Sequence, residues 1–396
     1  MLEGRGEVIL TVGIPGETFP GERRVAMTPG AFDKLIKAGM NVLVERGAGV
    51  SAGFPDSEYE AKGASITSRE EVFAKADVIC QVRTLGANPA AGFCDVPRLK
   101  PNQLIMGFAD PLTALAEMNV MAKAQVSLLS MELIPRITRA QAMDALSSMA
   151  TVAGYRAVLA GAAASARMFP MLTTAAGTIA PAKVFVLGCG VAGLQAIATA
   201  KRLGAVVSAY DVRPAAKEQA ESVGAKFVIL DIDAKSAEGA GGYAKAMDEE
   251  FYRRQRELMT AVLREQDVVI TTAAVPGKKA PVLITAEMAR AMHPGAVIVD
   301  MAAERGGNCE LTKFGEVVED SGVIILGPAN LPSEAAYHAS QMYAKNIATF
   351  LLHLAPKGQL TLNPEDEITR ESLVTHEGQI VHPRVAELAG PVLVGG

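Results

Sequence analysis

The fold of this 396-residue chain is indicated most clearly by one stretch, which reads Val184-Phe185-Val186-Leu187-Gly188-Cys189-Gly190-Val191-Ala192-Gly193. The apolar run predicts a buried strand, and the G-x-G-x-x-G spacing predicts a tight turn into a helix. In this pattern Gly188 permits the turn, Gly190 lets a pyrophosphate approach the backbone, and Gly193 lets helix and strand pack closely. A helix that begins near Val191 directs its N-terminal amides, Ala192 included, toward phosphate groups. The stretch therefore predicts a dinucleotide-binding Rossmann unit.

The acid that follows the next predicted strand indicates which dinucleotide is bound. Asp211 comes directly after the apolar run 206–210 and lies 18 residues beyond Gly193, close to the spacing of a ribose-binding acid. A carboxylate there accepts hydrogen bonds from a free ribose diol and repels a 2′-phosphate, so NAD is favoured over NADP. Arg213 complicates this prediction, because a nearby arginine could accommodate that phosphate. We expect Arg213 to stack on the adenine or to lie at the edge of the adenosine.

Strand-like and helix-like segments alternate along most of the chain, which predicts α/β layers with parallel sheets. Before the glycine stretch, we expect strands at 8–14, 41–44, 77–82 and 103–108, a helix at 31–38 and a long helix at 140–168. The segment 170–183 is interpreted as an interdomain loop. After it, we expect strands at 184–187, 206–210, 226–229, 267–271, 296–300 and 323–326, then a long helix at 333–354.

The two long helices suggest how the chain is divided into domains. If the chain enters and leaves its middle domain through them, the first domain is discontinuous. We therefore expect residues 1–150 and 335–396 to form an N-terminal α/β domain, and residues 151–334 to form the Rossmann domain.

Composition excludes several classes of protein. Hydrophobic residues make up 49% of the chain and charged residues 20%, which excludes intrinsic disorder. A net charge of −5 and the absence of a basic block argue against nucleic-acid binding. The mean hydropathy of +0.22 raises a membrane protein as a possibility, but charges or prolines interrupt the apolar runs. With no signal-peptide layout at its start, the chain is expected to be soluble and cytoplasmic.

Metal or disulfide chemistry is not indicated by the cysteines and histidines. The cysteines form no C-x-x-C pair, and they are Cys80, Cys94, Cys189 and Cys309. All five histidines follow residue 290, and none has the spacing of a zinc site. We expect reduced, mostly buried thiols and no bound metal.

Several blocks of sequence resemble a known family. The block 131–148, which reads MELIPRITRAQAMDALSS, and the segment 188–213 resemble the NAD(H)-binding component, or domain I, of proton-translocating NAD(P) transhydrogenases. Shorter similar segments are found at 241–245, 271–273, 276–277 and 303–309. These components share their fold with alanine dehydrogenases, so the resemblance covers the alanine dehydrogenase/transhydrogenase family.

The resemblance implies two Rossmann-like, doubly wound lobes around a cleft, usually in a homodimer. NADH bound to such a component passes a hydride to NADP+ on a different component, which binds NADP(H). A membrane-spanning component couples this transfer to proton translocation. The resemblance thus implies a position on the cytoplasmic face of the membrane, held there by partner subunits.

The resemblance also implies which residues contact NAD(H). The nicotinamide end is lined by Arg136, Gln141, Asp144 and Ser147. The rest of the nucleotide is contacted by Val191, Asp211, Val212, Arg213, Gly242, Gln255, Thr272 and Ala274. Tyr243 and Met247 lie on a mobile loop that closes over the nucleotide.

Physical reasoning about the nicotinamide end points in the same direction. In a helix, Asp144 shares one face with Gln141 and Ser147, because each is three residues away. A carboxamide has a donor and an acceptor, which a carboxylate and a hydroxyl can satisfy together. Ordinary helix capping at a solvated polar face is the alternative interpretation.

Alanine dehydrogenase activity is the main alternative function. Those enzymes carry a K-V-K triplet where this chain has Gln81-Val82-Arg83, and a His where Asp110 falls. Their acid corresponds to Glu304, and only Arg24 keeps the substrate-anchor pattern. Hydride transfer between two nicotinamides moves no proton at the ring and needs orientation rather than a general base. The sequence therefore favours transhydrogenation, with a non-catalytic NAD-binding regulatory module as a third possibility.

Overall fold

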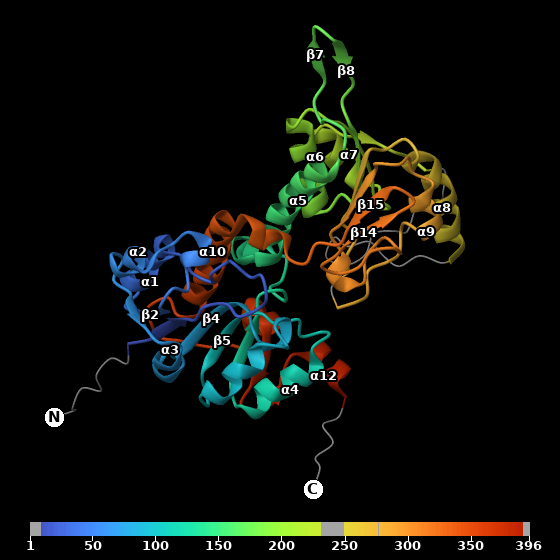
Figure 1. Ribbon diagram of the computed structural model, residues 1–396. Coiled ribbons are helices and arrows are strands. Elements are labelled where there is room, and N and C mark those ends of the chain that lie inside the picture. The colour runs from blue at the N-terminus through green and yellow to red at the C-terminus, as the bar shows by residue number, and fades with distance from the viewer. Residues whose placement is uncertain (1–8, 231–248, 276, 391–396) are drawn as a thin grey trace, which may run out of the picture. The chain divides into compact units, whose positions relative to one another are not determined.

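The computed structural model describes residues 9–230, 249–275 and 277–390 and divides the chain into two units (Figure 1). The first unit lies within Met1–Met149 and Ser333–Gly396, and the second lies within Ala150–Pro332. Each unit is built on its own large sheet.

The sheet of the second unit is centred on the strand that precedes the glycine turn. Its strands run in the order β11 (Lys226–Phe227), β10 (Val206–Tyr210), β9 (Lys183–Leu187), β12 (Val268–Thr271), β13 (Val297–Asp300), β15 (Val323–Leu326) and β14 (Val317–Asp320). All pairs are parallel except β14 with β15. The parallel strands follow the doubly wound order 3-2-1-4-5-6, so the chain changes direction between β9 and β12. Ligands of such sheets bind at this switch point.

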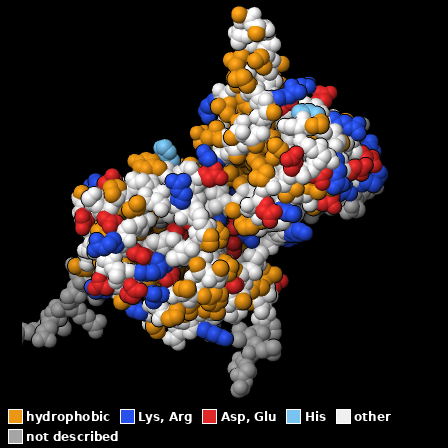
Figure 2. All heavy atoms as spheres, viewed as in Figure 1, with side chains coloured by type: hydrophobic (Ala, Val, Ile, Leu, Met, Phe, Trp, Pro, Cys, Tyr) orange, Lys and Arg blue, Asp and Glu red, His pale blue; other side chains and the backbone are white. Residues whose placement is uncertain are grey.

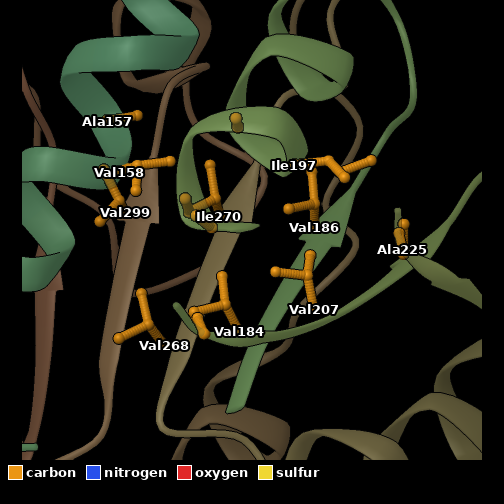
Figure 3. Close-up of a cluster of buried hydrophobic side chains, with 14 of the residues drawn as sticks. Ala157, Val158, Val184, Val186, Ile197, Val207, Ala225, Val268, Ile270 and Val299 are labelled. Carbon is orange, nitrogen blue, oxygen red and sulfur yellow. The ribbon is translucent and has the colours of Figure 1, made fainter. Parts of the chain in front are cut away.

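Helices cover both faces of this sheet. They are α5 (Ala145–Ala164), α6 (Val191–Arg202), α7 (Ala216–Ser222), α8 (Glu249–Leu263) and α9 (Ala286–Arg290), with a short 3-10 helix η7 (Ala303–Arg305). On one face, Val184 and Ile270 of the sheet pack with Val158 of α5 and Ile197 of α6 (Figure 3). Phe185 and Leu187 point to the opposite face and pack in a second cluster. Burial on both faces explains why these strands are continuous apolar runs in the sequence.

The sheet of the first unit repeats this order and adds strands at one edge. It runs β17 (Gln379–Ile380), β16 (Leu373–His376), β6 (Ser127–Ser130), β5 (Leu104–Phe108), β4 (Val78–Arg83), β1 (Thr11–Ile14), β2 (Asn41–Glu45) and β3 (Ser65–Thr67). Strands β1 to β6 are parallel, whereas β16 and β17 pair antiparallel. The prediction of two doubly wound α/β lobes is confirmed, but both sheets are mixed rather than wholly parallel.

The helices of the first unit are mostly short. They are α1 (Phe32–Lys37), α2 (Asp56–Glu60), α3 (Arg69–Lys75), α4 (Leu115–Lys123), α10 (Ala336–Leu354), α11 (Glu367–Ser372) and α12 (Pro383–Ala389). The 3-10 helices are η1 (Pro29–Ala31), η2 (Val50–Ala52), η3 (Leu85–Ala87), η4 (Gly92–Arg98), η5 (Thr138–Met143) and η8 (Leu331–Ala335). The long helix α10 is buried along one side, where the Tyr343 hydroxyl donates to the carbonyl of Gln81 at 2.8 Å.

Two sequence-based expectations were wrong in detail. The helix expected at 140–168 spans only Ala145–Ala164, because the chain forms η5 before it and leaves the helix well before Pro170. The segment 170–183 is not an interdomain loop, since it lies within the second unit and forms a hairpin of β7 (Leu172–Thr174) and β8 (Gly177–Ile179). Gly177 makes the turn with φ +119°. The projecting hairpin presents hydrophobic and uncharged side chains (Figure 2).

Candidate dinucleotide-binding site

The three glycines of the turn have different surroundings. Gly188 has φ +96°, a conformation that side chains disfavour, and its amide donates to the carbonyl of Tyr210 at 2.8 Å. A Cβ on Gly193 would lie 1.8 Å from the Gly188 carbonyl oxygen, so only glycine fits there. A Cβ on Gly190, the N-cap of α6, would meet no described atom within 4 Å. The open space at Gly190 is what a pyrophosphate needs to approach the backbone.

The start of α6 is supported from two sides. A Cβ on Gly154 of α5 would lie 2.1 Å from the Ala192 carbonyl oxygen, so the two helix backbones are in direct contact. On the other side, the Thr272 hydroxyl donates to the Gly188 carbonyl at 3.0 Å. This bond ties the loop after β12 to the turn after β9, at the switch point of the sheet. Ala274 is exposed in the same loop.

Asp211 follows β10 directly and is brought to the glycine turn. Its Oδ2 accepts from the Cys189 amide at 2.7 Å, and its Oδ1 accepts from the Arg213 amide at 2.9 Å. The Arg213 side chain turns back onto the same carboxylate, with Nε 2.9 Å from Oδ1 and Nη2 2.8 Å from Oδ2. Between them, Val212 packs against the second apolar cluster. The acid and arginine therefore form a closed pair beside the turn.

Two buried side chains that were not predicted from the sequence hold the loop after β12. Asn308 accepts from the Ala273 amide at 3.0 Å and donates to the Ala273 carbonyl at 2.8 Å and the Pro281 carbonyl at 2.9 Å. Asp300, at the end of β13, accepts from the Asn308 amide at 2.7 Å and the Thr271 hydroxyl at 2.9 Å. The signal in the sequence was an acid at a strand end, followed by Gly-Gly-Asn.

In the first unit, the structure brings Asp144 and Ser147 together. Asp144 Oδ1 accepts from the Ser147 amide at 2.8 Å, and Oδ2 accepts from the Ser147 hydroxyl at 2.6 Å. The shared helical face with Gln141 was a wrong expectation, because Asp144 has ψ 87° and separates η5 from α5. Asp144 therefore caps α5. Gln141 is exposed on η5, and Arg136 is exposed in the preceding loop.

Some expected contacts cannot be placed. Gly242, Tyr243 and Met247 lie outside the described residues. Gln255 belongs to α8, but its side chain also lies outside the described part of the chain.

The residues compared with alanine dehydrogenases lie at the switch point of the first unit, between β1 and β4. The Arg24 guanidinium donates to both oxygens of Glu22, at 2.7 and 2.6 Å. Arg83 lies over the ring of Phe19, 4.2 Å from its centroid, and its Nε is 3.5 Å from Glu22. Glu17 accepts from the amides of Val82 and Arg83, and burial together with the charge of Glu22 raises its pKa to about 8. Internal carboxylates thus contact the basic side chains of this region.

A second carboxyl group of the first unit is also perturbed. Glu132 accepts from the amides of Ala109 and Asp110, at 2.8 and 2.6 Å, and from the Ser130 hydroxyl at 2.5 Å. Burial and the neighbouring charge of Asp110 raise the pKa of Glu132 to about 7. Asp110, where a dehydrogenase His was expected, has a left-handed backbone with φ +48°.

Neither a metal site nor a membrane span is found in the part of the chain that the structure describes. In residues 9–230, 249–275 and 277–390, no group of His, Cys, Asp or Glu side chains is placed to hold a metal ion. Within the same ranges, no helix has both the length and the apolarity to cross a membrane. The thiols of Cys80, Cys189 and Cys309 are buried, and that of Cys94 is exposed.

A doubly wound sheet whose first strand ends at a glycine turn faced by an acid defines a dinucleotide-binding protein. Comparison with known proteins is consistent with this class. The family model of the alanine dehydrogenase/PNT N-terminal domain matches residues 13–153, and that of the C-terminal domain matches residues 157–383. The chain belongs to the alanine dehydrogenase/PNT family, whose members bind nicotinamide nucleotides.

Relatives with two different activities are found in this family. An NAD(P) transhydrogenase alpha subunit of Rhodospirillum rubrum is 49% identical over 379 residues, which cover 94% of this chain and 98% of the relative. A crystal structure of transhydrogenase from Sinorhizobium meliloti has a TM-score of 0.83 and 44% identity, covering 94% of this chain and 100% of that one. Alanine dehydrogenase 1 of Staphylococcus aureus is 27% identical over 387 residues, covering 95% of this chain and 96% of the relative.

Proposed function

We propose that this chain is the NAD(H)-binding subunit of an NAD(P) transhydrogenase. NADH bound to it transfers a hydride directly to NADP+ held by a partner component. The observation that carries the proposal is the Asp211 carboxylate, bonded to the Cys189 amide at 2.7 Å in the middle of the glycine turn. An acid at this position suits a free ribose diol, and the greater identity to a transhydrogenase subunit than to an alanine dehydrogenase gives the reaction class.

Each part of the nucleotide has residues suited to it. The N-terminal amides of α6 and the open space at Gly190 suit a pyrophosphate, and Asp211 suits the adenosine ribose. We assign the nicotinamide carboxamide to Asp144 and Ser147, with Arg136 and Gln141 beside it. Holding the carboxamide decides which face of the nicotinamide ring presents its hydride.

The chemistry of the first unit agrees better with transhydrogenation than with amino-acid oxidation. Oxidising an amino acid to an imine requires a group that removes a proton and a free anchor for a carboxylate. Here Arg24 is bonded to Glu22 through both of its donor groups, and Gln81 and Arg83 stand in place of lysines. Hydride transfer between nicotinamides needs neither group, since no proton leaves the ring.

Partner subunits are included in the proposal. The NADP(H) site belongs to one partner component, and a membrane-spanning component couples hydride transfer to proton translocation. The chain is then peripheral on the cytoplasmic face of the membrane and pairs as a homodimer. The uncharged hairpin of β7 and β8, with Met171 62% and Ile179 45% exposed, supports contact with another protein chain.

The test mixes the purified chain with the NADP(H)-binding component of a transhydrogenase. We expect NADPH-dependent reduction of an acetylpyridine analogue of NAD+, followed by its absorbance, with a rate that rises in proportion to the chain added. The component alone gives the background rate.

Two other outcomes identify the alternatives. Oxidation of NADH by the chain alone in the presence of pyruvate and ammonium would show an alanine dehydrogenase. NADH binding without hydride transfer, in a pair whose folding is verified by circular dichroism, would favour the regulatory module.

A further inference from the structure

The Asp211 carboxylate is saturated with hydrogen bonds from its own chain. Oδ1 accepts from the Arg213 amide and Nε, and Oδ2 accepts from the Cys189 amide and Arg213 Nη2, all between 2.7 and 2.9 Å. A carboxylate offers about four acceptor positions, two on each oxygen. A ribose hydroxyl can therefore bond to Asp211 only if one of these donors leaves.

The donor that can leave is the guanidinium. The amides of Cys189 and Arg213 are fixed by the backbone of the glycine turn and of the chain after β10, whereas the Arg213 side chain can rotate about its own bonds. Its side chain is 15% exposed, against 5% for Asp211, so it forms the outer side of the pair. Binding of a ribose diol to Asp211 thus releases the Arg213 guanidinium at the edge of the ribose site.

A guanidinium in that place is suited to a second ligand. Its planar fork of donors matches the oxygens of a phosphate and binds them bidentately. We propose that Arg213 is a concealed ligand for the 2′-phosphate of NADP(H), which Asp211 keeps out of use. Asp211 then selects NAD(H) in two ways, by repelling a 2′-phosphate and by occupying the arginine that would bind it. This inference rests on the proposed function, because it assumes that the site binds a nicotinamide dinucleotide.

The proposal makes opposite predictions for the two members of the pair. Removing the acid frees Arg213, so Asp211→Ser is expected to weaken NADH binding and to create NADPH binding. Removing the arginine leaves the repulsion in place, so Arg213→Gln is expected to gain no NADPH affinity. NADH binding to Arg213→Gln is expected to be unchanged or tighter, because a competitor for Asp211 is gone.

The experiment measures the dissociation constants of NADH and NADPH by fluorescence titration for four proteins: the unchanged chain, Asp211→Ser, Arg213→Gln and the double variant. We expect Asp211→Ser to bind NADPH about tenfold or more tightly than the unchanged chain does, as charge-assisted hydrogen bonds allow. The double variant is expected to lose that gain. Should Asp211→Ser fail to fold by circular dichroism, Asp211→Asn removes the charge while keeping an acceptor for the Cys189 amide, and the same comparison applies.

Three results would overturn the proposal. They are an unchanged NADPH affinity in the Asp211 variant, an equal gain in the double variant, and a strong loss of NADH affinity in Arg213→Gln. The proposed function has its own failure, which is an unchanged chain that binds no NADH at all. A chain that binds NADH while the variants behave otherwise contradicts the Arg213 proposal alone.

Discussion

At the scale of single residues, Asp144 has two roles that a substitution can separate. Its carboxylate caps α5 through the Ser147 amide, and it also holds the Ser147 hydroxyl at 2.6 Å. Asparagine is as good an N-cap as aspartate, so Asp144→Asn preserves the helix while removing the charge. A change in this variant therefore reports on the site rather than on folding.

We predict that Asp144→Asn slows hydride transfer to the partner component about tenfold, which corresponds to about 1.4 kcal/mol of orientation at the nicotinamide. NADH affinity is expected to change less, because the pyrophosphate and adenosine contacts remain. The measurement is the transfer rate at saturating NADH together with an NADH titration. Asp33→Asn, which removes an exposed carboxylate from the same unit, is the matched control. An undiminished rate would remove Asp144 from the nicotinamide site.

At the scale of elements, the strand–turn–helix of β9 and α6 depends on contacts that differ between neighbouring glycines. A Cβ on Gly193 would overlap the Gly188 carbonyl, whereas a Cβ on Gly190 would extend into open space with φ −76°, which alanine tolerates. The two positions therefore test packing and ligand approach separately.

We predict that Gly190→Ala folds with an unchanged melting temperature but binds NADH at least about tenfold more weakly, since its methyl group would meet the pyrophosphate. Gly193→Ala is expected to lose more than about 3 kcal/mol of stability, because the close approach of α6 to the turn has no room for a methyl group. Thermal unfolding and NADH titration of both variants check this. Wild-type NADH affinity in Gly190→Ala would mean that the pyrophosphate binds elsewhere.

At the scale of the whole molecule, two sheets with the same strand order have switch points with different contents. In the second unit the switch point has an open glycine turn. In the first unit, Glu17 closes the corresponding place by accepting from the amides of Val82 at 2.6 Å and Arg83 at 3.1 Å, at the end of β4. Because its pKa is raised to about 8, this carboxyl group makes stability depend on pH.

The sign of that dependence follows from proton uptake on folding. The unfolded chain loses the Glu17 proton near the ordinary glutamate pKa of 4.5, whereas the folded chain keeps it until about pH 8, so stability falls as pH rises between these values. We predict a loss of about 2 kcal/mol between pH 6 and pH 9, allowing for partial exposure of the side chain. Glu132, with its pKa raised to about 7, acts in the same direction.

Urea unfolding across this pH range tests the prediction. Glu17→Gln is expected to flatten the dependence above pH 7, while Glu60→Gln, at an exposed position of α2, is expected to leave it unchanged. The slopes are compared rather than the absolute stabilities, since glutamine cannot accept from both amides as a carboxylate does. A slope that is the same in Glu17→Gln and the unchanged chain would contradict the assignment.

The features that could be predicted from the sequence are the local ones. Apolar runs such as 184–187 and 268–271 form buried strands wherever both faces of a sheet are covered, and the spacing of Gly188, Gly190 and Gly193 specifies a turn within a few residues. The position of Asp211 at a strand end follows from the same local pattern. These features depend on neighbours in the chain, so their signal is present in the sequence.

The features that required the folded chain depend on partners distant in sequence. Folding placed Asn308 against Ala273, 35 residues away, and Thr272 against Gly188, 84 residues away. It made Asp144 a cap rather than a member of a helical face, formed a hairpin within 170–183, and added antiparallel strands to the edges of both sheets. It also turned Arg213 onto Asp211. Polar groups and sheet edges take whichever partners the packed chain brings within hydrogen-bonding distance, and composition and spacing do not specify those partners.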